Sequence, residues 1–151
     1  MTYADPDTDI STLTGLELLR YGSSRPEPPA TIGRLLGIKF TNLEVGAIEA
    51  QLRTRADFSN PLGSVHGGIC AALLDTVMGC AVHSTLPAGA GFTTLELKVN
   101  YIRAVSTSDE VVRATGRTIH VGGRTATAEG KAFDSEGRLV AHGTTTCMIF
   151  R

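Results

Sequence analysis

The chain has 151 residues, of which 42% are hydrophobic and 19% are charged, a composition typical of one folded domain and not of a disordered chain. Fourteen lysines and arginines against fifteen acidic residues give a formal net charge of −1. Without a basic excess, nucleic acid is not an expected partner.

The cysteine content and the most apolar segment both indicate a protein of the reducing cytosol. Cys70, Cys80 and Cys147 cannot all pair, and the first 20 residues are too polar for a secretory leader. The most apolar stretch, residues 69–82, is shorter than the roughly 20 residues that span a bilayer. We therefore expect a cytoplasmic protein with no membrane partner.

Residues 1–37 are predicted to form a helical appendage to a main domain of residues 38–151. Thr14 and Glu17 have the spacing of a capping box, which predicts a short helix after Thr14. The proline-rich residues 26–29 should end it. A second short helix, residues 31–36, is expected to end at Gly37 in the left-handed conformation.

The main domain is predicted to be α+β, with about six antiparallel strands and one long helix. The strands are expected at residues 38–43, 47–53, 92–103, 110–121, 124–133 and 138–150, and the helix at residues 67–84. Hairpin connections favour an antiparallel sheet, and one helix has to cover it. Its other face would remain uncovered, which favours an oligomer.

Side-chain alternation gives two further expectations for the strands. In residues 92–103, Leu95 and Leu97 should share the apolar face with Val99 and Tyr101. In residues 124–133, positions 126, 128, 130 and 132 carry only alanine or glycine. A face that flat allows another element to approach closely.

Asp75 is the only charged residue between positions 65 and 86. An ionised carboxylate in apolar surroundings is costly unless it is paired, hydrogen-bonded or used in function. The surrounding helical positions are mostly small residues, which leaves space beside the carboxyl group. A structural Asp satisfied by a neighbouring amide or hydroxyl and a functional Asp both remain open.

The long helix begins with His66-Gly67-Gly68, and a helix start offers unpaired N–H groups to an anion or a developing oxyanion. The glycines can equally serve only to shape the turn. Gly67 and Asp75 are eight residues apart, about 12 Å along a helix, whereas groups acting on one carbonyl must lie within about 3–3.5 Å of it. Two antiparallel copies of the helix would bring Asp75 of one to Gly67 of the other.

Other catalytic motifs are missing from the sequence. His66, His83, His120 and His142 have no metal-ligand spacing with each other or with the cysteines. There is also no P-loop and no nucleophile elbow. We expect neither a metal nor a separate cofactor.

The pattern Asn60-x-x-Gly63-x-x-His66-Gly67-Gly68 followed by Asp75 resembles the hotdog-fold acyl-CoA thioesterases, especially the branch typified by the phenylacetate-degradation thioesterase. Thr94-Leu-Glu-Leu97 followed by Asn100-Tyr101 and Arg103 is a secondary match. The resemblance covers about residues 35–150. It implies a hotdog fold, in which an antiparallel sheet wraps a long helix, and dimers or dimers of dimers.

The resemblance also implies roles for particular residues. Asp75 would be the general base or the nucleophile, and the Gly67 amide would polarise the thioester carbonyl. Asn60 and His66 would help to orient that carbonyl, and Thr94 would hold the attacking water. Coenzyme A, as part of the substrate, would lie near the turn that contains Gly123, Arg124 and Thr125.

One conflict and two alternatives remain open at this point. Strand alternation places Thr93 on the apolar face, whereas the resemblance favours Thr94. A hydratase or dehydratase of the same fold would also act on acyl thioesters, through a paired acid and base. A non-catalytic acyl-CoA-binding module is the second alternative. The acyl group is not identified, although Leu35, Leu36 and the N-terminal helices are candidates to line its binding site.

Overall fold

A computed structural model describes residues 9–26, 30–108 and 110–150. Its elements are a 3₁₀ turn at Ile10–Thr12, α1 (Gly15–Ser24), α2 (Ile32–Leu36), β1 (Lys39–Glu44), β2 (Ala47–Arg53), a 3₁₀ turn at Ala56–Phe58, α3 (Gly67–His83), β3 (Gly91–Tyr101), β4 (Val111–Val121), β5 (Thr125–Phe133) and β6 (Leu139–Phe150). The predicted α+β class, with six strands and one long helix, is confirmed.

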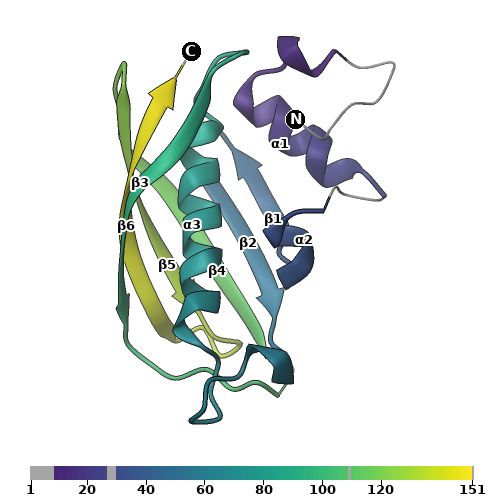
Figure 1. Ribbon diagram of the computed structural model, residues 1–151, viewed down its shortest axis with the longest axis vertical. Helices are drawn as coiled ribbons and strands as arrows, with labels where there is room; N and C mark the ends of the chain where they lie inside the picture. Colours follow the sequence, from purple (N-terminus) through teal and green to yellow (C-terminus); the bar gives the residue numbers. More distant parts are fainter. Residues whose placement is uncertain (1–8, 27–29, 109, 151) are drawn as a thin grey trace.

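The six strands form one antiparallel sheet in the order β1-β2-β4-β5-β6-β3. The sheet curves around α3, which runs along its concave face (Figure 1). Because β1 and β3 are the two edges, one face of α3 lies between them and is not covered by the sheet. That uncovered face carries the features described below.

The short N-terminal helices form where their local signals predict them. Thr14 and Glu17 make the reciprocal capping box at the start of α1. Thr31 caps α2, and Gly37 ends it with φ 71°. Of the proline segment predicted to end α1, Pro26 is described and residues 27–29 lie outside the described residues.

The long helix α3 packs against the flat face that was predicted on β5. Ala126, Ala128 and Ala132 are fully buried. A Cβ at Gly130 would lie 2.9 Å from Met78 Cγ, and one at Gly116 on β4 would lie 2.3 Å from the Val77 carbonyl oxygen. The small residues therefore allow the helix to approach β4 and β5 closely.

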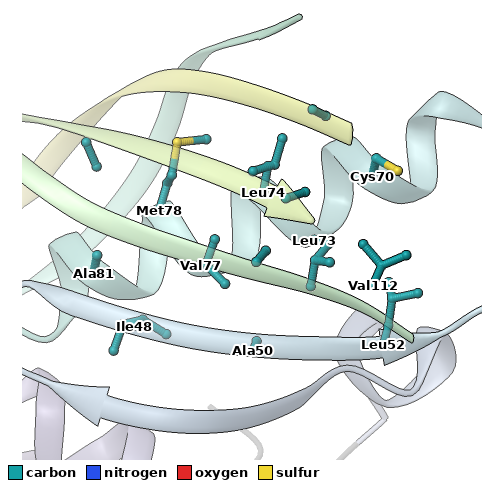
Figure 2. Close-up of a cluster of buried hydrophobic side chains, with 14 of the residues drawn as sticks. Ile48, Ala50, Leu52, Cys70, Leu73, Leu74, Val77, Met78, Ala81 and Val112 are labelled. Atoms are coloured by element: carbon teal, nitrogen blue, oxygen red, sulfur yellow. The ribbon is translucent and has the colours of Figure 1, made fainter. Parts of the chain in front are cut away.

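The core is built by the face of α3 that points at the sheet. Its most buried side chains are those of Leu73, Leu74, Val77, Met78 and Val82. Figure 2 shows several of them directed at Ile48, Leu52 and Val112 on β2 and β4. Complete burial of such a side chain contributes about 1.5–3 kcal/mol, so this packing fixes the helix and every group that it carries.

Candidate active site

Asp75 lies midway along α3, half-buried, and its carboxylate faces β3. The Thr94 hydroxyl donates a hydrogen bond of 2.9 Å to Asp75 Oδ1. Asp75 Oδ2 has no hydrogen-bond partner among the described residues. Oδ2 is not a buried atom without a partner, because every buried side-chain oxygen in the described part of the chain is hydrogen-bonded. One carboxylate oxygen is thus oriented, and the other is open to a ligand or water.

A β-bulge explains why the contact is made by Thr94. The pairing of β3 with β6 shifts register between Thr94 and Glu96, so Leu95 is an extra residue. Thr94 points at α3 before the bulge and Leu97 does so after it, while Thr93 and Leu95 are exposed. The alternation that placed Thr93 and Leu95 on the apolar face was wrong, because it assumed an unbroken two-residue period.

The surroundings of Asp75 are uncharged near neutral pH. Burial, together with the nearby Asp75 charge, raises the pKa of the Cys80 thiol to about 12. Burial also raises the pKa of Cys147, which pairs with Thr94 across the sheet. Within the described part of the chain, no lysine or arginine forms an ion pair with Asp75. The hydroxyl of Thr94 is therefore the group that orients this carboxylate.

His66 caps the N-terminus of α3. Its Nδ1 accepts a hydrogen bond of 2.9 Å from the Gly68 amide, and its own amide donates to the Phe58 carbonyl. Since Nδ1 is the acceptor, the neutral ring carries its proton on Nε2. The exposed ring of His66 can therefore donate from Nε2 toward a ligand at the helix start.

Gly67 is the first residue of α3, and its amide has no acceptor among the described residues. The Tyr101 hydroxyl donates to the Gly67 carbonyl at 2.9 Å, and a Cβ at position 67 would lie 3.0 Å from Tyr101 Cζ. Tyr101 thus covers one side of Gly67. From sequence, Tyr101 was expected on the apolar face of its strand and had no assigned role in the site; its place at the end of a strand beside the helix start is a long-range feature.

Asn60 is engaged within its own loop. Its Oδ1 accepts from the Leu62 and Ser64 amides, and its Nδ2 donates to Ser64 Oγ. These bonds shape residues 60–64, which lead into the start of α3. The side chain makes no hydrogen bond with Gly67 among the described residues, so the orienting role expected for Asn60 remains a prediction.

The turn between β4 and β5 contains the residues expected to contact coenzyme A. The Gly122 amide donates to the Thr125 carbonyl, and the Ile149 amide donates to the Arg124 carbonyl. Gly123, Arg124 and Thr125 are exposed. Register relates this turn to Asp75, because Ala126 pairs with Cys147, which pairs with Thr94. The turn therefore lies at the same end of the sheet as Thr94, the residue of β3 that contacts Asp75.

Within one chain the predicted site residues form two separate groups. Asp75 and Thr94 make one group, while His66, Gly67 and Tyr101 make the other. The two groups are about 12 Å apart along α3. They lie near opposite ends of β3, so one copy of the chain does not bring them to the same carbonyl.

No group of three or more metal-ligating side chains occurs among the described residues. None of the helices in this part of the chain has the length and apolar character needed to cross a membrane.

Comparison with known proteins relates this arrangement to one family. Residues 62–141 match the family described as the thioesterase superfamily. The proofreading thioesterase EntH of Klebsiella pneumoniae subsp. pneumoniae is 34% identical over 103 residues, which cover 68% of this chain and 74% of that protein. The match to the family covers Gly67, Asp75 and Thr94, whereas residues 9–61 lie outside it.

Solved structures share the fold. The Escherichia coli PaaI protein from the phenylacetic acid degradation operon has a TM-score of 0.75 at 20% identity and covers 82% of this chain and 86% of its own. A conserved Pseudomonas aeruginosa protein has a TM-score of 0.74 at 34% identity, with 80% and 94% covered. The predicted hotdog fold, in its phenylacetate-degradation-like form, is confirmed.

Proposed function

Because the chain belongs to the thioesterase superfamily and is a thioester hydrolase, we propose that it hydrolyses acyl-CoA thioesters to a free acid and coenzyme A. The observation that carries this proposal is the hydrogen bond from Thr94 to Asp75, which is the only charged residue of α3. A carboxylate held in uncharged surroundings with one free oxygen is suited to general-base or nucleophilic work.

The chemistry needs only groups that the chain possesses. Asp75 Oδ2 accepts a proton from water, which attacks the thioester carbonyl, or Oδ2 attacks that carbon itself. The negative charge then develops on the carbonyl oxygen, and the Gly67 amide and His66 Nε2–H are the donors that would stabilise it. The tetrahedral intermediate collapses by expelling the coenzyme A thiolate, a good leaving group that requires no metal. In the general-base route this gives the free acid directly, and the proton held by Asp75 passes to the thiolate. In the nucleophilic route it leaves a mixed anhydride on Asp75, which water hydrolyses to the free acid.

The proposal requires two copies of the chain, because Asp75 and Gly67 are too far apart within one. β3 is an edge strand, so its outer side is available for pairing. In an antiparallel pair of β3 strands, the Thr94 end of one strand would lie beside the Tyr101 end of the partner's strand. Asp75 of one subunit would then approach the helix start of the other.

The exposed outer face of the sheet supports further association. It carries Leu95, Ile119, Met148 and Phe150, each at least 38% exposed. Apolar residues gathered on one face favour contact with another molecule. We propose a homodimer as the catalytic unit and a dimer of dimers as the assembly.

Recognition of coenzyme A is assigned to the turn between β4 and β5. The phosphates of coenzyme A need cationic partners, and Arg124 is an exposed cation in this turn. Gly123 has open space around its Cα, and Thr125 adds a hydroxyl. These features support Gly123, Arg124 and Thr125 as a nucleotide-contacting surface.

A thiol-release screen with acetyl-, decanoyl- and phenylacetyl-CoA tests the proposed function. We expect free coenzyme A from at least one of them and no hydration of crotonyl-CoA. Hydration of crotonyl-CoA without thiol release would replace hydrolysis by the hydratase alternative. Tight binding of acyl-CoA without any turnover would indicate a binding module.

A further inference from the structure

A cavity of about 660 Å³ lies between the N-terminal helices, β1 and the C-terminal half of α3. Its described lining includes Leu18, Leu19 and Ser23 of α1, Phe40 of β1, and Cys80 and His83 of α3. In Figure 1, α1 lies beside the end of α3, and α2 lies beside β1. Most of this lining lies outside the residues that match the family.

The wall that α1 contributes is fixed to the main domain at two points. The Gly15 amide donates to the Leu86 carbonyl at 3.0 Å, and a Cβ at Gly15 would lie 1.8 Å from the His83 carbonyl oxygen. The Arg20 guanidinium donates to the Leu43 carbonyl at 3.0 Å. Because α1 is anchored to both α3 and β1, the cavity is a built part of the fold.

The floor of the cavity is uncharged near neutral pH. Burial raises the pKa of Cys80 and lowers the pKa of His83, so the first stays a thiol and the second a neutral imidazole. Leu18, Leu19 and Phe40 add apolar surface; the charged residues of the described lining are Arg25, Arg34 and Lys39, and none is a carboxylate. A volume of this size falls within the roughly 300–1,000 Å³ of small-molecule sites.

The same face of α3 carries both the cavity floor and Asp75. Ala72, Asp75, Thr76, Cys80 and His83 are the half-buried residues of this face, at helical spacing, while Leu73, Leu74, Val77 and Met78 point into the sheet. Cys80 lies five residues beyond Asp75, about 7.5 Å along the axis and about 140° around it, so the two side chains stand at opposite margins of this face. The charge of Asp75 contributes to the pKa of Cys80, so the two side chains are electrostatically close.

We infer that this cavity binds the distal, apolar part of the acyl group, and that the chain favours linear acyl groups of about eight or more carbons. The inference rests on the proposed function, because it places the thioester carbonyl at Asp75. An extended chain advances about 1.2 Å per bond, so six or seven bonds cover the axial distance from Asp75 to Cys80, and the offset around the helix adds to this. An acetyl group is too short to reach the cavity.

Neighbouring serines on α1 provide a matched test. Ser23 lines the cavity and Ser24 does not, yet each hydroxyl donates to a carbonyl of its own helix. Ser23→Trp should fill the cavity, and Ser24→Trp adds the same bulk outside it. Cys80→Phe fills the cavity from the floor and serves as a second, independent variant. Thermal unfolding first shows that each variant is folded.

The readout is the affinity for two non-hydrolysable thioethers, S-decyl-CoA and S-ethyl-CoA, measured by calorimetry. We expect the wild type to bind S-decyl-CoA at least about tenfold more tightly, since each buried methylene contributes about 0.8 kcal/mol. Ser23→Trp or Cys80→Phe should remove most of that preference, and Ser24→Trp should keep it. Equal affinity of the wild type for both thioethers, or a preference that survives both filling variants, would overturn the inference.

Thiol release separates this result from failure of the proposed function. If acetyl-CoA is hydrolysed as well as decanoyl-CoA, and both filling variants leave that ratio unchanged, the cavity assignment is wrong and the hydrolase stands. If no acyl-CoA releases thiol while the wild type prefers S-decyl-CoA, the cavity assignment stands and the hydrolytic function is wrong.

Discussion

At the scale of single residues, the site depends on Asp75 and the hydroxyl that orients it. Asp75→Asn keeps the volume of the side chain and can still accept from Thr94, but it can neither take a proton from water nor attack a carbonyl. We expect thiol release to fall by about 10²–10⁴-fold. The melting temperature should hold or rise, since a functional carboxylate in apolar surroundings often costs stability.

The opposite pattern would mark Asp75 as structural. In that case Asp75→Asn would lower the melting temperature, and turnover would fall only in proportion to the folded protein that is lost. Binding of a thioether analogue by the variant provides the control, because it shows that the rest of the site is intact.

Thr94 and Thr93 form a natural pair for testing the orienting hydrogen bond. Thr94→Val removes the donor at 2.9 Å from Asp75, and a hydrogen bond to a charged group contributes about 1.5–3 kcal/mol. We expect kcat to fall by roughly 10–100-fold. Thr93→Val makes the same chemical change at an exposed position and should leave kcat near that of the wild type. Equal losses of kcat in the two variants would show that the Thr94 hydroxyl has no specific role in the reaction.

His83 should make stability depend on pH. Burial lowers its pKa in the folded protein below the usual value of 6.5, so the unfolded chain binds a proton more readily. The contribution is fully present above about pH 6.5 and is lost as the pH falls through the lowered folded value. Urea unfolding should therefore give a lower free energy of unfolding at pH 5 than at pH 7.5.

His83→Phe keeps a ring against Phe92 and should reduce that decrease. His120→Gln, which replaces an exposed imidazole, is the control and should leave it unchanged. A pH dependence that His83→Phe does not alter would assign the effect to other groups.

At the scale of elements, the position of α3 depends on the absence of side chains beneath it. Gly116→Ala would push a Cβ against the backbone of Val77, which cannot move without shifting the helix. Gly130→Ala meets the flexible end of Met78. We expect a loss of about 3 kcal/mol or more in the free energy of unfolding for Gly116→Ala and about 1 kcal/mol for Gly130→Ala, measured by urea denaturation. Similar losses would show that the contact at Val77 relaxes as easily as that at Met78.

The elements predicted from sequence are those fixed by local signals. The capping box at Thr14, the left-handed Gly37 and the largely apolar run of α3 act within a few residues, and the structure has all three. The bulge at Leu95 carries no such signal, so the alternation of β3 was misread there. The contact of Tyr101 with Gly67 joins residues 34 positions apart, and local pattern alone does not show it.

Sequence patterns pointed to the N-terminal helices as candidates to line an acyl site, and these helices do line the cavity, but the patterns did not identify the leucines involved. Leu35 was a candidate for lining an acyl site, but it is 64% exposed, and Leu36 is buried in the core. Leu18 and Leu19 line the cavity instead. Which leucine of an amphipathic helix faces a cavity depends on how α1 docks on α3 and β1, and that docking is a tertiary property.

At the scale of the whole molecule, we propose that each active site takes Asp75 from one subunit and the Gly67 amide from the other. The separation of about 12 Å along α3 was visible in the sequence spacing alone. The structure adds that Asp75 is engaged with Thr94 and Gly67 with Tyr101. A single chain therefore supplies two incomplete halves.

Gly67→Pro is the most specific way to remove the contribution of the Gly67 amide. Proline lacks the amide hydrogen and is tolerated at the first position of a helix. His66 already has the extended backbone, φ −60° and ψ 134°, that a residue before proline requires. Gly67→Ala is the control, because it adds a Cβ at the same place and keeps the amide hydrogen.

Complementation between two inactive variants tests the central claim most directly. We would unfold Asp75→Asn and Gly67→Pro proteins together, refold the mixture and measure thiol release from an acyl-CoA. A mixed dimer has one site with both defects and one with neither, so random mixing should restore about a quarter of wild-type activity. Activity that stays at the level of the separate variants, although mixed dimers have formed, would contradict a site shared between subunits.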